Sequence, residues 1–173
     1  PMKNEGPFIL EWVAYHRLIG VNDIMVFSND CEDGSDLLLD RLDDLGYIRH
    51  YQNPTSFLET KQHHLTAIRY ANTFTRLNRS DWILSLDADE FLCINAGKGH
   101  VFDLLDAMPE DAEVISLNQL NFGCNGHRHY EDGGLQMDRF TSCHRLDGDW
   151  NGTSADCIPD DVVNQACTTI DTD

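Results

Sequence analysis

The sequence has 173 residues, of which 41% are hydrophobic and 24% are charged, so its length and composition fit one globular domain with a buried core. Its 12 Lys and Arg residues are outnumbered by 30 Asp and Glu residues, which gives a formal net charge of −18. A nucleic-acid backbone and an anionic membrane surface both attract clustered basic residues, and the sequence has no such cluster. We therefore expect neither of them as a partner.

The start of the chain predicts a helix and then a buried strand. Apolar residues recur at helical spacing over residues 6–19, Pro7 lies in the first turn, and Gly20 provides a stop. Residues 24–27 form a continuous apolar run, which is typical of a strand buried on both faces. A polar turn at residues 28–34 follows this strand.

A second helix, a second strand and a long third helix are expected next. Ser35 is a favourable N-cap for a helix over residues 35–45, and Gly46 suits its C-terminal end. Residues 47–51 predict a short strand. A capping-box sequence, Ser-Phe-Leu-Glu, begins a segment that predicts one helix over residues 56–77.

The second half of the chain predicts fewer regular elements. We expect a strand at residues 82–86, a short helix at 101–107 and a strand at 114–117, whereas periodicity fails from about residue 121. Helices that alternate with strands indicate an α/β sheet with crossover helices. The sequence thus predicts a single α/β domain, with a mostly parallel central sheet flanked by helices and an irregular, acidic C-terminal part.

The most informative motif is the Asp-Ala-Asp sequence that follows the predicted strand at 82–86. Asp87 and Asp89 would lie at the carboxyl end of a central strand, where open α/β sheets bind ligands. Two carboxylates so close repel each other, and a divalent ion with oxygen ligands, such as Mg²⁺ or Mn²⁺, relieves that repulsion. The alternative interpretation is a solvated acidic turn.

Two further polar loops are predicted at the same edge of the sheet. Lys3, Asn4 and Glu5 precede the first helix, and Asn29 and Asp30 follow the first strand. Each loop alone is typical of a capped helix start. Three loops that converge on one edge favour a cleft large enough for a nucleotide.

Taken in order, these motifs resemble a known family. Pro-x-x-Asn-Glu, Asn-Asp-Cys-x-Asp-Gly-Ser and Leu-Asp-Ala-Asp-Glu-Phe look like the motifs of family 2 glycosyltransferases with the GT-A (Rossmann-like) fold. The longer stretch Lys-Asn-Glu-Gly-Pro-Phe-Ile-Leu-Glu-Trp-Val-Ala-Tyr-His and a later Asn-Phe-Gly are similar to the bacterial "glycosyltransferase family 2-like" branch. The resemblance covers roughly residues 1–125.

The resemblance implies a transferase that moves a sugar from a UDP- or GDP-sugar donor to a hydroxyl of a glycan or another acceptor. It implies an inverting reaction that depends on Mn²⁺ or Mg²⁺, in which Asp87 and Asp89 hold the metal against the diphosphate. It also places one group of residues beside the nucleoside: Lys3, Asn4, Glu5, Asn29 and Asp30. Glu131 and Asp132 follow the Asn-Phe-Gly loop, where a carboxylate that deprotonates the acceptor is expected.

The resemblance also suggests how the chain is organised. Residues 1–125 would form a nucleotide-sugar-binding GT-A-like core whose first strand lies upstream of Pro1. Residues 126–173 would supply acceptor-side loops and a poorly ordered or truncated tail. The chain lacks an apolar run of about 18 residues, so no transmembrane segment is expected, and no signal peptide is apparent, which favours the cytoplasm.

Two departures from the family pattern and two other functions remain open. Asn29 stands where many relatives carry Asp, and a late metal-binding His has only His127, His129 and His144 as substitutes. A GT-A-like module that binds a nucleotide or a glycan without turnover is the main alternative. A phosphohydrolase of the haloacid-dehalogenase type also carries Asp-x-Asp after a strand, but near the start of its chain.

Overall fold

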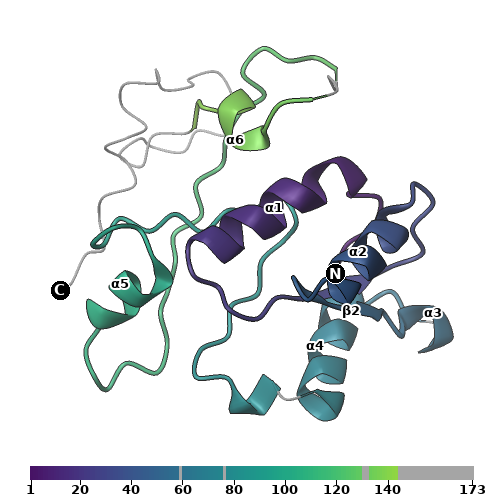
Figure 1. Ribbon diagram of the computed structural model, residues 1–173, viewed down its shortest axis with the longest axis horizontal. Helices are drawn as coiled ribbons and strands as arrows, with labels where there is room; N and C mark the ends of the chain where they lie inside the picture. The colour runs from purple at the N-terminus through teal and green to yellow at the C-terminus, as the bar shows by residue number, and fades with distance from the viewer. Residues whose placement is uncertain (59, 76, 130–132, 144–173) are drawn as a thin grey trace. The chain divides into compact units, whose positions relative to one another are not determined.

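The computed structural model describes residues 1–58, 60–75, 77–129 and 133–143 (Figure 1). The chain divides into two compact units, residues 1–92 and residues 93–173. The first unit holds β1, β2, α1 to α4 and a short 3₁₀ helix, and the second holds α5 and α6.

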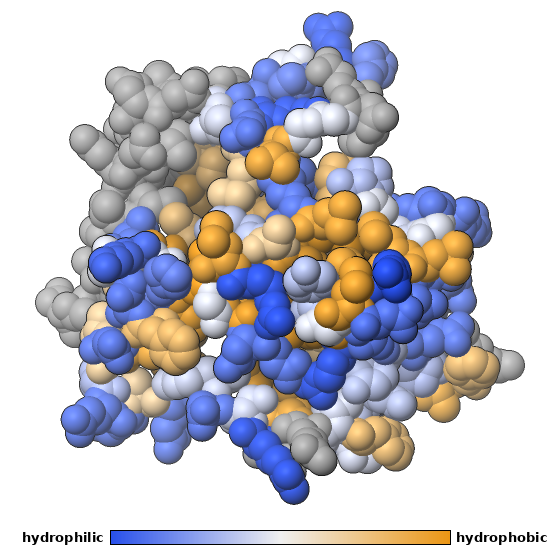
Figure 2. All heavy atoms as spheres, viewed as in Figure 1, coloured by the Kyte–Doolittle hydropathy of each residue, from blue (hydrophilic) through white to orange (hydrophobic). Residues whose placement is uncertain are grey.

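Helix α1 spans Gly6–Leu18, close to the predicted helix, and Pro7 lies in its first turn. Ile9, Trp12, Val13 and His16 recur every three or four residues and are buried. The opposite side of α1 is also partly apolar, since Leu10 and Leu18 are exposed. Figure 2 shows apolar side chains gathered over this helix.

Strands β1 (Met25–Ser28) and β2 (Arg49–Gln52) form a parallel pair, in a register that places Met25 opposite Arg49 and Ser28 opposite Gln52. Helix α2 (Ser35–Asp44) is the crossover between them. Met2 extends this arrangement on the other edge of β1, through a parallel bridge to Ser28. The Met2 N–H donates to Phe27 at 2.7 Å, and the Asn29 N–H donates to Met2 at 2.9 Å.

The core of the first unit lies between this sheet and helices α1 and α2. Apolar burial of this kind is the main favourable term in folding. Its buried members come from the first loop, both helices, β1 and the residues just before each strand: Met2, Ile9, Trp12, Val13, Ile24, Val26, Leu39, Leu42 and Ile48.

The long helix predicted over residues 56–77 is wrong: the structure has α3 (Thr55–Leu58), a break, α4 (His63–Phe74) and a 3₁₀ turn, η1 (Leu77–Arg79). Side-chain hydrogen bonds at the break compete with helical ones. Thr60 Oγ1 accepts from the Gln62 N–H at 3.2 Å, and Thr55 Oγ1 lies 3.0 Å from His63 Nδ1.

The strands predicted at 82–86 and 114–117 are also wrong, since neither segment is a strand in the described chain. Apolar composition favours a strand only where a neighbouring edge is available for pairing. Both edges of β1 are occupied, one by β2 and the other by Met2, and the outer edge of β2 has no strand partner in the described chain. The α/β class is confirmed, with a parallel sheet of two strands in place of the larger predicted one. The assignment to the GT-A fold stays a prediction.

The second unit is mostly irregular among its described residues. Helix α5 (Val101–Asp106) matches the predicted short helix, and α6 spans Gln136–Arg139. An isolated antiparallel bridge joins Phe122 to Cys143. No helix in the described part of either unit is long and apolar enough to cross a membrane.

Candidate functional site

Three loops meet where Met2, β1 and β2 end, at the carboxyl edge of the parallel segments. The Glu32 N–H donates to Asn4 Oδ1 at 2.8 Å, and the Gly6 N–H donates to Asp33 Oδ2 at 3.2 Å. Asn4 and Asp30 both have positive φ angles, 57° and 42°, a region that Asn and Asp occupy more readily than most residues. Hydrogen bonds therefore join the first loop to the loop after β1. The sequence predicted that these two loops lie at the same edge of the sheet.

Asp33 joins the starts of two helices at this edge. Its carboxylate accepts from the Ser35 N–H at 2.9 Å, from the Ser35 hydroxyl at 2.8 Å and from the Gly6 N–H at the start of α1. The Ser35 hydrogen bonds are the largest cause that lowers the pKa of Asp33, because they stabilise its charged form. Gly34, with φ of 87°, occupies the N-cap position of α2 in place of the predicted Ser35.

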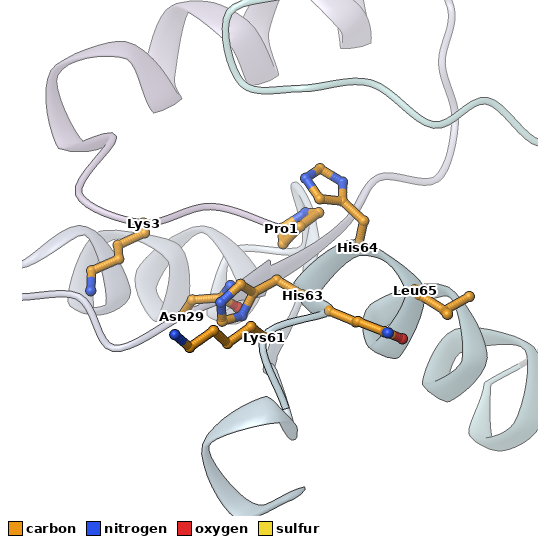
Figure 3. Close-up of a pocket in the computed structure, with 8 residues that line it drawn as sticks. Pro1, Lys3, Asn29, Lys61, His63, His64 and Leu65 are labelled. Atoms are coloured by element: carbon orange, nitrogen blue, oxygen red, sulfur yellow. The ribbon is translucent and has the colours of Figure 1, made fainter. Parts of the chain in front are cut away.

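A pocket of about 520 Å³ opens at this edge, within the first unit (Figure 3). Its walls come from the first loop, the end of β1 and the start of α4. The lining residues are Pro1, Lys3, Asn29, Lys61, Gln62, His63, His64 and Leu65. The lining therefore holds two lysines and two histidines and no carboxylate, in a chain with 30 acidic residues.

Asn29 is the most buried polar group of the pocket, with 8% of its surface exposed. Its Oδ1 atom is buried and has no hydrogen-bond partner in the described parts of the chain. An unsatisfied buried acceptor costs about 1–3 kcal/mol. A ligand that donates an N–H or O–H to Asn29 would recover that free energy.

The start of α4 is held in place from β2. Asn53, which follows β2 and is buried, donates from Nδ2 to the carbonyl of His63 at 3.1 Å. The Asn53 N–H itself donates to the carbonyl of Ser28 at 2.9 Å. Asn53 thus couples the end of the sheet to the first turn of α4, which forms one wall of the pocket.

The acidic turn after residue 86 is anchored on α1. Trp12 Nε1 donates to the carbonyl of Glu90 at 2.9 Å, and the Tyr15 hydroxyl donates to the carbonyl of Leu92 at 2.9 Å. The Glu90 carboxylate accepts from the Asp87 N–H at 2.9 Å, which closes the turn.

His16 ties α1 to the same turn from inside the core, with 1% of its surface exposed. Its Nδ1 lies 2.8 Å from the carbonyl of Trp12 and donates to it, so Nε2 is the acceptor for the Leu92 N–H at 3.4 Å. Burial is the larger cause and lowers the pKa of His16, against the opposing effect of the bond to Trp12. His16 is therefore a neutral structural link.

Asp87 and Asp89 are both exposed, and they have different neighbours. Asp87 Oδ1 lies 3.8 Å from His64 Nδ1, at the pocket. Asp89 lies near Glu5, whose pKa is raised by partial burial first and then by the charges of Asp89 and Asp33. No three His, Cys, Asp or Glu side chains in the described parts of the chain converge on a common metal position.

The structure places the predicted site residues unequally. Lys3 and Asn29 line the pocket, and Asp87 contacts its wall through His64. Asn4, Glu5 and Asp30 lie in the two interlocked loops without lining the pocket. Glu131 and Asp132 lie outside the described residues.

Sequence reasoning missed the wall formed by Lys61 to Leu65. It predicted a continuous helix there, in which these residues would be spread around the helix and would not form its exposed first turn. The signal that could have found the break is Thr60, whose hydroxyl accepts from the Gln62 N–H.

Comparison with known families assigns the chain to the glycosyltransferases. The chain belongs to glycosyltransferase family 92, whose sequence model matches residues 1–145. The match agrees with the predicted glycosyltransferase class, but the family is 92 and the match does not single out the bacterial family 2-like branch.

Two curated plant proteins are similar to the chain. A glycosyltransferase family 92 protein of Oryza sativa subsp. japonica is 30% identical over 92 residues, which cover 53% of this chain and 15% of the relative. A glycosyltransferase family 92 protein of Ricinus communis is 26% identical over 144 residues, which cover 79% of this chain and 24% of the relative. The chain thus spans a quarter or less of these relatives, and no solved structure matches it.

Proposed function

We propose that this chain carries the donor-binding part of a glycosyltransferase that uses a nucleotide-sugar, with UDP or GDP as the nucleotide. The observation that supports this most directly is the pocket at the carboxyl edge of parallel strands, where α/β folds bind nucleotides, in a member of glycosyltransferase family 92. The two interlocked loops, with Lys3 and Asn29 in the pocket, lie beside the nucleoside. The unsatisfied Asn29 Oδ1 accepts an N–H of the base or an O–H of the ribose.

Asp87 and Asp89 hold Mg²⁺ or Mn²⁺ in this proposal. Both are exposed carboxylates, the oxygen ligands that these ions prefer. The pKa of Glu5 is raised first by partial burial and then by the negative charges of Asp89 and Asp33, and a cation beside the first loop would relieve that repulsion. When bound, the metal supplies a positive charge that stabilises the departing diphosphate.

The acceptor side of the reaction rests on Glu131 and Asp132. One of these carboxylates removes the proton from the acceptor hydroxyl as its oxygen bonds to the anomeric carbon of the sugar. The bond from that carbon to the donor phosphate breaks in the same step, so the configuration inverts and the nucleoside diphosphate departs. A glycan or another hydroxyl compound is the acceptor.

Thermal unfolding tests the donor site. UDP and GDP are each added with and without Mn²⁺ to the wild type, to Asp89→Asn and to a matched control, Asp43→Asn, which neutralises an exposed carboxylate on α2. A ligand at about 100 times its Kd stabilises the fold by ~2.7 kcal/mol. We expect one nucleotide with Mn²⁺ to raise the Tm of the wild type and of Asp43→Asn, and to raise the Tm of Asp89→Asn by less, because that variant loses the contribution of the metal.

Release of sugar from the donor then separates an enzyme from a binding module. We expect the wild type with Mn²⁺ to cleave the nucleotide-sugar that matches the stabilising nucleotide, and Asp89→Asn to lose that activity. Binding without any cleavage would favour the non-catalytic module. An absence of binding by either nucleotide, with and without Mn²⁺, would overturn the proposed function.

A further inference from the structure

The pocket has a basic wall that neither the motifs nor the family match accounts for. Helix α4 has 12 residues and starts at His63, and no side chain of its N-cap residue, Gln62, caps the first turn. The first backbone N–H groups of a helix have no partner within the helix. In α4 these belong to His63, His64 and Leu65, which are the three helical residues that line the pocket.

The side chains around this wall carry positive charge, although the chain as a whole has a net charge of −18. Lys61 and Lys3 line the same pocket, and Figure 3 shows the Lys61 side chain beside Asn29 and His63. The positive end of the α4 dipole adds to these two charges. The Asp87 carboxylate lies 3.8 Å from His64 Nδ1, so it faces the imidazole of that wall residue.

The second observation that points to a ligand is Asn29. This residue is more than nine-tenths buried and lines the pocket, and its buried Oδ1 atom has no hydrogen-bond partner in the described chain. A simple anion offers no donor to this oxygen. A ligand that satisfies both features carries an N–H or O–H donor together with a negatively charged group.

We infer that Lys61 and the first turn of α4 form the subsite for the phosphates of the donor nucleotide, a binding site that works without the metal. The inference rests on the proposed function and identifies which residues of the donor site contact the phosphates. Backbone N–H groups at a helix start, together with a lysine, are well suited to phosphate oxygens. The metal at Asp87 and Asp89 and the wall of α4 would then contact the diphosphate from different elements.

Titration calorimetry in EDTA tests this subsite. The probes are UDP, GDP and inorganic pyrophosphate, with uridine and guanosine as probes that lack phosphate. We expect Lys61→Gln to raise the Kd of pyrophosphate and of the nucleotide that binds by about tenfold or more, because one charge-assisted contact is lost. The Kd of the matching nucleoside should not change.

Two controls separate a phosphate contact from damage to the fold. Lys98→Gln removes an exposed lysine of the other unit and should leave every Kd unchanged. His63→Pro removes one backbone N–H at the first helical position, where proline is tolerated, and His63→Ala keeps that N–H while it removes the same side chain. We expect the proline variant to bind pyrophosphate more weakly than the alanine variant, with similar Tm values in the absence of ligand.

The outcomes distinguish this inference from the proposed function. If the wild type binds UDP or GDP with Mn²⁺ and Lys61→Gln binds pyrophosphate and the nucleotide as the wild type does, the subsite is wrong and the donor site stands. If no phosphate probe binds the wild type under any condition, both are wrong. Weakened pyrophosphate binding in both Lys61→Gln and His63→Pro supports the subsite.

Discussion

At the scale of single residues, buried polar groups tie together segments of this protein that are distant in the chain. His16 lies inside the core and bonds to Trp12 and to Leu92, so it links α1 to the turn that carries Asp87 and Asp89. Its neutral form is favoured, because burial lowers its pKa below the ordinary value.

This burial of His16 predicts a pH dependence of stability. When a histidine has a lower pKa in the folded than in the unfolded state, the unfolded state binds protons more readily. Its contribution to the free energy of unfolding is therefore full above about pH 6.5 and is lost as the pH falls toward the folded pKa. We expect the urea midpoint of the wild type to be lower at pH 5.5 than at pH 7.5. The measurement is urea unfolding at both pH values.

His16→Leu is the matching variant, because it keeps an apolar side chain and removes the titrating group. It should be less stable at pH 7.5, since the Leu92 N–H loses its acceptor, but its midpoint should depend less on pH. An equal slope in both proteins would assign the pH dependence to other histidines.

At the scale of secondary-structure elements, side-chain hydrogen bonds at the starts of helices fix the neighbouring loops. Asp33 joins the starts of α1 and α2. In the first turn of α5, Asp103 Oδ2 accepts from the N–H groups of Lys98 at 2.8 Å and His100 at 3.0 Å, and so holds the preceding loop against the helix. These backbone hydrogen bonds lower the pKa of Asp103. Gly97, with φ of 54°, lets the preceding loop reach the same carboxylate.

The pair Gly97→Ala and Gly126→Ala tests this loop. Both glycines have positive φ, which costs an alanine about 1–2 kcal/mol. A methyl group on Gly126 would meet nothing within 4 Å, whereas one on Gly97 would lie 2.5 Å from Asp103 Cγ. We expect Gly97→Ala to lower the free energy of unfolding by ~1–3 kcal/mol more than Gly126→Ala, measured by urea unfolding. Equal losses would mean that the loop moves away from Asp103 at little cost.

For the whole molecule, the net charge of −18 is the dominant electrostatic fact. Self-repulsion of such a charge destabilises the compact state, and salt screens it over a Debye length of about 10 Å at 0.1 M. We therefore expect the urea midpoint to rise between 20 mM and 500 mM NaCl. Ion pairs such as Arg49 with Asp23 oppose this trend, and a midpoint that fell with salt would show that such pairs outweigh the repulsion.

The sequence predicted the elements of the first unit better than it predicted their partners. Helices α1 and α2 were found from their periodicity and their ends, and β1 from its apolar run. The segments at 82–86 and 114–117 have the same apolar character as β1 and are not strands in the described chain. The difference lies in pairing: β1 lies between Met2 and β2, whereas these two segments belong to no sheet in the described chain.

The candidate site was likewise predicted in part. Lys3 and Asn29 were chosen from loops at strand ends, and both line the pocket. Lys61 and His63 were missed, because the local signal at Thr60 was overlooked and because the start of α4 is also held by bonds from Thr55 and Asn53, which lie eight and ten residues away in the chain. The roles assigned to Asp87 and Asp89 stay predictions, although the turn that carries them is anchored by Trp12.

By itself the sequence determined helices α1, α2 and α5, the buried strand β1 and the class of protein. Helix caps, glycine stops and apolar periodicity act over a few residues, and the ordered motifs of the loops identify a glycosyltransferase without any knowledge of their contacts. The tertiary structure alone decided which loops meet, which asparagine is buried without a partner, and that the start of α4 forms a basic wall. The physical reason is that these features depend on hydrogen bonds and burial between residues that are distant in the chain.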